Sequence, residues 1–122
     1  MPAQLKLAKG KTVKLCVIQE PPVYLNLAKT MERACDLIES AAKEGAQLVV
    51  FPEAWFPGYP TFVWRLAPGA GMGKTDELFG LLQDNAIDRI NGGLDPLCEK
   101  AAEHGVVLVI GYNELDSGMS GS

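Results

Sequence analysis

Hydrophobic and polar residues follow two alternating patterns along this chain. Short apolar runs rich in Val, Leu and Ile are typical of strands that are covered on both faces. Between them, apolar residues recur at intervals of three and four, which is typical of amphipathic helices. We therefore expect strands at residues 12–19, 47–51 and 106–110 and helices at residues 25–44, 76–90 and 95–104.

The order of these elements predicts an α/β fold. Strands that alternate with helices run parallel and are joined by right-handed crossovers. Residues 1–11 lack either pattern, and we expect a flexible leader followed by one domain over residues 12–122. The proline-rich, aromatic stretch at residues 52–74 predicts a long functional loop, because structureless loops of this length are otherwise uncommon.

Charge and composition exclude several classes of function. Residues 15–122 carry seven basic and fifteen acidic residues, a balance that argues against a nucleic-acid partner. No apolar run reaches the length of a membrane span and the start has no signal-peptide core, so we expect a cytoplasmic protein without a membrane partner. Cys16, Cys35 and Cys98 are far apart, without metal-ligand spacing, and are expected to be free thiols on buried apolar faces.

Candidate chemistry is concentrated where the second predicted strand ends. Pro52 cannot donate to a sheet ladder, so Glu53 follows directly at the carboxyl end of the strand, where open α/β sheets bind ligands. The aromatic residues on both sides predict partial desolvation of this carboxylate, which suits a general base. The alternative is a structural role, in which Glu53 caps backbone groups or pairs with Arg65.

The sequence F-P-E-A-W, followed by F-P-G-Y-P and an aromatic run to Trp64, resembles the nitrilase branch of the carbon–nitrogen hydrolase superfamily. The resemblance covers most of the chain and includes G-Y-N-E at residues 111–114. It implies the first half of a four-layer α-β-β-α sandwich, incomplete in this chain. It also implies that Glu53 is the catalytic glutamate and that Trp55 and Tyr59 bind substrate.

The implied reaction converts a nitrile and water into a carboxylic acid and ammonia through a cysteine thioimidate, with Glu53 as general base. A lysine and a cysteine complete the family's catalytic set, and neither is identified in this chain, which we therefore expect to be inactive as given. The scheme requires no metal and no organic cofactor. The implied partners are a small nitrile, the remainder of the hydrolase domain and further copies of the subunit.

Two other functions are alternatives to this one. The first is a non-catalytic assembly or pseudo-enzyme fragment that pairs with full-length subunits. The second is a degenerate P-loop at residues 68–75, but G-x-x-x-x-G-K-[ST] requires glycine where Pro68 stands. His104, at a predicted helix end, and Glu114 are expected to have structural roles.

Overall fold

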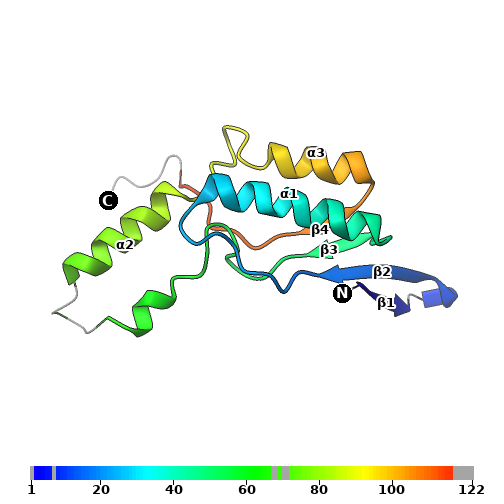
Figure 1. Cartoon of the computed structure of the whole chain (residues 1–122), viewed down its shortest axis with the longest axis horizontal. Helices are drawn as coiled ribbons and strands as arrows, with labels where there is room; N and C mark the ends of the chain where they lie inside the picture. Colours follow the sequence, from blue (N-terminus) through cyan, green and yellow to red (C-terminus); the bar gives the residue numbers. More distant parts are fainter. Residues whose placement is uncertain (1, 7, 67–68, 70–71, 117–122) are drawn as a thin grey trace.

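The computed structural model describes residues 2–6, 8–66, 69 and 72–116, in which a layer of strands is covered on one face by two helices while a third helix lies beyond the strand ends (Figure 1). The elements follow the alternation expected from the apolar pattern. They are β1 (Pro2–Lys6), η1 (Ala8–Gly10), β2 (Thr12–Val17), α1 (Leu27–Lys43), β3 (Leu48–Val50), η2 (Thr61–Trp64), α2 (Met72–Asp84), α3 (Asp95–His104) and β4 (Val107–Val109), where η denotes a 3-10 helix.

The four strands form one sheet in the order β1-β2-β3-β4. β2, β3 and β4 are parallel, which confirms the orientation predicted for the three apolar strands. Their register aligns Cys16 with Val49 and Val49 with Leu108. Because side chains alternate across a strand, these three residues share one face of the sheet.

β1 was not expected from the sequence. Residues 2–6 of the predicted flexible leader pair with β2 in antiparallel register. The chain reverses direction between the two strands through Lys9 and Gly10, which have left-handed φ angles of 68° and 76°. β1 thereby pairs with the side of β2 that does not face β3.

The helices α1 and α3 cover the face of the sheet that carries Cys16, Val49 and Leu108 (Figure 1). α1 begins after Asn26, whose side chain accepts a hydrogen bond from the Lys29 N–H group, a stabilising N-terminal cap. α3 ends at Gly105, which has a left-handed φ of 63°. The core between helices and sheet includes Ala34, Ile38, Val49 and Leu97, each at most 1% exposed.

The other face of the sheet is apolar and open to solvent in the described structure. Val17, Val50 and Val109 are aligned across the strands on this face. Val17 is 41% exposed and Val109 is 51% exposed. Val107, two residues before Val109 on the same face of β4, is 64% exposed. The covered and the open face of the sheet are thus both apolar.

α2 and the segment before it differ from the prediction. The helix spans Met72–Asp84 rather than residues 76–90, and residues 61–64 form a 3-10 helix within the predicted loop. α2 lies beyond the carboxyl ends of the parallel strands (Figure 1). Phe62 and Phe79 join η2 to α2 by an edge-to-face ring contact with centroids 5.1 Å apart. In the described ranges, no helix combines the length and apolar character needed to cross a membrane.

Candidate functional site

The segments that follow β2, β3 and β4 meet at the carboxyl edge of the sheet. Sheet pairing continues one residue past the strands, since Ile18 N–H donates to the Val50 carbonyl and Phe51 N–H donates to the Val109 carbonyl, both at 2.8 Å. Beyond this point, Trp55 N–H donates to the Gly111 carbonyl at 2.9 Å. The edge is therefore held by backbone hydrogen bonds between residues far apart in the sequence.

An open cavity of about 600 Å³ lies at this edge. Its walls are residues 17–22, after β2, and residues 50–55 with Gly58 and Tyr59, after β3. Most of the lining is apolar, and Glu53 and Glu20 contribute the two carboxylates. An apolar pocket with a few polar groups is typical of small-molecule sites.

Glu53 lies in this cavity, as expected for a residue that follows a central parallel strand. Its side chain is exposed, so the predicted partial desolvation is not observed. Within the described part of the chain it makes no hydrogen bond or ion pair, and the alternative pairing with Arg65 is absent there. Glu53 is therefore a carboxylate without a structural partner among the described residues.

The aromatic neighbours of Glu53 turn into the core instead of surrounding its carboxylate. Ala54 has a left-handed φ of 48°, and the backbone reverses direction at this residue. Phe51, Trp55 and Phe56 are at most 4% exposed. Their rings pack edge to face, with centroids 4.9 Å apart for Phe51 and Trp55 and 5.0 Å apart for Trp55 and Phe56. This aromatic cluster packs the loop against the core, while Glu53 stays at the surface.

Trp55 and Tyr59, the two predicted substrate-binding residues, line the same cavity as Glu53. Trp55 is 3% exposed, and its indole N–H is already engaged by a protein carbonyl. Tyr59 is 45% exposed and offers more surface to a ligand. The structure thus brings all three predicted residues to one site, while contact with substrate stays a prediction.

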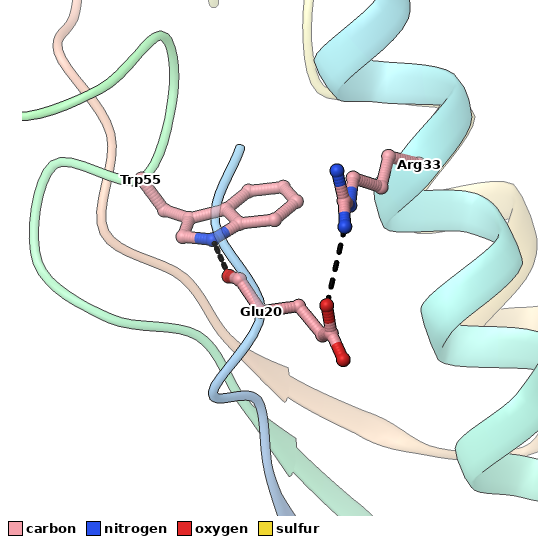
Figure 2. Close-up of polar contacts among 3 residues, drawn as sticks. All are labelled: Glu20, Arg33 and Trp55. Atoms are coloured by element: carbon pink, nitrogen blue, oxygen red, sulfur yellow. Dashed lines mark hydrogen bonds and ion pairs between the residues drawn. The ribbon is translucent and has the colours of Figure 1, made fainter. Parts of the chain in front are cut away.

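Glu20, which sequence reasoning did not select, also lines this cavity, and Arg33 on α1 pairs with it. The Glu20 carbonyl accepts the Trp55 indole N–H at 2.8 Å, and the Glu20 carboxylate pairs with Arg33 at 3.1 Å (Figure 2). Glu20 comes three residues after the end of β2 and before two prolines, a position analogous to that of Glu53, three residues after the end of β3. That analogy was the available sequence signal.

Gly111 is required by the close approach of two backbones beneath Glu53. A Cβ atom at this position would lie 2.6 Å from the Glu53 Cα and 2.7 Å from the Ala54 nitrogen. Any side chain here would displace the backbone that carries Glu53. Gly58 is similarly restricted, because a Cβ would lie 2.6 Å from the Tyr24 ring atom Cε2.

The three cysteines are free, and none lines the cavity that holds Glu53. Cys16 is buried, and partial burial raises the pKa of the Cys35 thiol, with Lys100 acting in the opposite direction. Cys98 is exposed, so its predicted burial is wrong. The neighbouring Leu97 occupies the core-facing position of α3 instead and is 1% exposed.

The remaining predicted sites have structural contacts or lie partly outside the described residues. Glu114 pairs with Arg89 at 2.9 Å, which raises the pKa of Arg89. His104 ends α3, as expected. The P-loop-like segment, residues 68–75, is described only at residue 69 and from residue 72 onward. Among the described residues, no group of three or more His, Cys, Asp or Glu side chains is arranged to hold a metal ion.

Comparison with known proteins adds an independent observation. The sequence profile of the family described as carbon–nitrogen hydrolase matches residues 14–120. The chain is 36% identical to an arylacetonitrilase of Aspergillus oryzae over 102 residues, or 84% of this chain and 29% of that protein. It is 34% identical to an aliphatic nitrilase of Rhodococcus rhodochrous over 107 residues, or 88% of this chain and 28% of that protein. It therefore spans less than a third of the length of these relatives.

Proposed function

This chain belongs to the carbon–nitrogen hydrolase family, and we propose that it forms part of a nitrilase-type enzyme in which Glu53 is the general base. The observation that carries this proposal is the position of Glu53. It stands at the carboxyl end of a central parallel strand, in a mostly apolar cavity, without a hydrogen-bond or ion-pair partner among the described residues. A carboxylate with no structural role to fulfil is available for proton transfer.

In the proposed reaction, Glu53 takes the proton of a cysteine thiol and the thiolate adds to the nitrile carbon. The nitrile nitrogen receives a proton, which leaves a covalent thioimidate, and a lysine stabilises the charge that develops on that nitrogen. Water then adds to the thioimidate carbon and the carbon–nitrogen bond breaks, releasing ammonia. A second water, activated by Glu53, releases the carboxylic acid and restores the thiol.

The cysteine and the lysine are proposed to come from sequence beyond this chain. Cys16 is in the core, while Cys35 and Cys98 lie on helices and outside the Glu53 cavity. The relatives are more than three times as long as the segment matched here, which leaves ample chain for both residues. On this proposal the present chain alone does not hydrolyse nitriles.

The open face of the sheet supports the four-layer α-β-β-α arrangement. Its residues are apolar, and Val17, Val107 and Val109 are 41% to 64% exposed. A strand that is apolar on both sides is typical of a sheet that is covered on both sides. We assign this face to the second sheet of the hydrolase domain, with α1 and α3 as one outer layer.

A small nitrile is the proposed substrate class. The printed names of the relatives include both arylacetonitrilases and an aliphatic nitrilase, and the apolar lining of the cavity suits either kind of side chain. Tyr59 and Trp55 are the residues proposed to contact it. Association into homo-oligomers and a cytoplasmic location stay predictions.

A chimera tests the proposal directly. Residues 14–114 would replace the matched part of the Aspergillus oryzae arylacetonitrilase, and ammonia release would be measured with arylacetonitriles and aliphatic nitriles. Glu53→Gln keeps the size of the side chain but removes the base, and we expect at least a hundredfold loss of kcat. Glu39→Gln changes a partly exposed glutamate on α1 that pairs with Lys43; it is the matched control and should retain activity. Activity that survives Glu53→Gln would refute the proposal.

A further inference from the structure

The two walls of the Glu53 cavity are joined by a hydrogen bond between side chain and backbone. One wall follows β2 and the other follows β3. Trp55 Nε1, on the second wall, donates to the Glu20 carbonyl, on the first wall, at 2.8 Å. Because Trp55 is two residues after Glu53, this bond bears on the distance between the Glu53 loop and the opposite wall.

The segment that carries the Glu20 carbonyl has few backbone donors with which to form hydrogen bonds of its own. Pro21 and Pro22, which follow Glu20, have no backbone N–H groups and cannot donate to neighbouring segments. The Glu20 side chain instead accepts a hydrogen bond from the Arg33 guanidinium at 3.1 Å. Arg33 lies on α1, which is packed on the sheet, so the bond connects a proline-rich loop to a rigid element.

Figure 2 shows Glu20 between the two partners, with the Trp55 ring on one side and Arg33 on the other. The side chains of Arg33 and Glu20 are 38% and 57% exposed. Ion pairs at this level of exposure contribute little to stability. The effect of the ion pair is therefore geometric: it fixes the position of the Glu20 carbonyl that accepts the hydrogen bond from the Trp55 indole N–H.

We propose that Glu20 is a positioning residue for the loop that carries Glu53 and that Arg33 anchors it. This inference rests on the proposed function, because it takes Glu53 as the general base; it assigns no proton transfer to Glu20. Loss of the indole N–H or of the guanidinium would let the two walls move apart and displace Glu53 from the reacting thiol. Displacements of this kind lower the rate of the chemical step more than they lower substrate affinity.

The test uses the chimera with Trp55→Phe, Arg33→Met, both together, and Arg33→Lys. Each of the first two should lower kcat about fivefold to tenfold, in line with one hydrogen bond. For Arg33, which does not line the cavity, KM should change less than about twofold. Because both act through Glu20, the double variant should be no worse than the poorer single variant. Arg33→Lys keeps the charge and should restore most of kcat. Glu39→Gln should be neutral and should combine additively with Trp55→Phe.

A second measurement does not depend on activity. Hydrogen exchange of the Trp55 indole N–H should be slow in the parent chimera and fast after Arg33→Met. Trp64, which is 79% exposed, provides the fast-exchanging reference in the same molecule. Unchanged protection after Arg33→Met, or additive losses of kcat in the double variant, would overturn the positioning role and leave Glu53 untouched. Activity after Glu53→Gln would instead refute the proposed function, and the exchange result would still stand.

Discussion

The two faces of the sheet differ in cover but not in composition. On one face, Val49 is completely buried beneath α1 and α3. On the other face, Val107 and Val109 are more than half exposed, although their strand, β4, pairs directly with the strand that carries Val49. A continuous apolar run indicates that burial is favourable for the side chains on both faces of a strand. The identity of the cover on each side comes from elements far away in the sequence.

The largest effect should come from the covered face. Ile38 of α1 is fully buried against the sheet, and Ile38→Ala should destabilise the 122-residue chain by about 2–5 kcal/mol through lost burial and a residual cavity. In the 122-residue chain, Val107→Ala on the open face should change stability by no more than about 0.5 kcal/mol. Urea unfolding followed by circular dichroism measures both. Equal costs in the two variants would contradict the assignment of the faces.

A smaller and more selective effect should reveal whether a second sheet covers the open face. Val109→Thr keeps the shape of the side chain but adds a hydroxyl group. In the chimera, burial of that hydroxyl without a partner should cost about 1–3 kcal/mol, whereas in the 122-residue chain the change should stay within about 0.5 kcal/mol.

The matched control for this comparison is Val49→Thr on the covered face. Val49 is buried by α1 and α3 in this chain, so the substitution should cost about 1–3 kcal/mol in both proteins. If Val109→Thr were harmless in the chimera as well, the proposed second sheet would not lie on this face.

The smallest perturbation is chemical labelling of the three native thiols, which measures how accessible each cysteine is to solvent. Cys98 is exposed, Cys35 is partly buried and Cys16 is buried. Because burial raises the pKa of Cys35, its thiolate fraction at pH 8 is lower, and its reactivity should increase as the pH rises toward that pKa. Alkylation by iodoacetamide, followed by peptide mass spectrometry, should label Cys98 first, Cys35 second and Cys16 last. Early labelling of Cys16 would contradict its position beneath α1.

Elements with a long and regular apolar pattern were predicted well from the sequence. The helix expected at residues 25–44 is α1 at Leu27–Lys43, and the helix expected at residues 95–104 is α3. Both have one face packed on the core, so local periodicity and tertiary packing favour the same structure. α2 was misplaced because its apolar pattern is weaker and its contacts with the core are few.

The site was only partly predictable. A proline and a glutamate after a buried strand indicated where Glu53 would lie, and the cavity is found there. The same sequence suggested that the aromatic residues would surround the carboxylate, but their larger gain is burial in the core, and a left-handed Ala54 separates them from Glu53.

The sequence by itself determined the parallel strands, the two core helices and the place of Glu53 at a strand end, because these follow from local periodicity and from proline chemistry. Only the tertiary structure decided which face of the sheet α1 and α3 cover, that Gly111 lies against the Glu53 backbone, and that Glu20 meets both Trp55 and Arg33. Those contacts join residues 13 to 58 positions apart in the chain, and no local pattern encodes which distant partner will be adjacent.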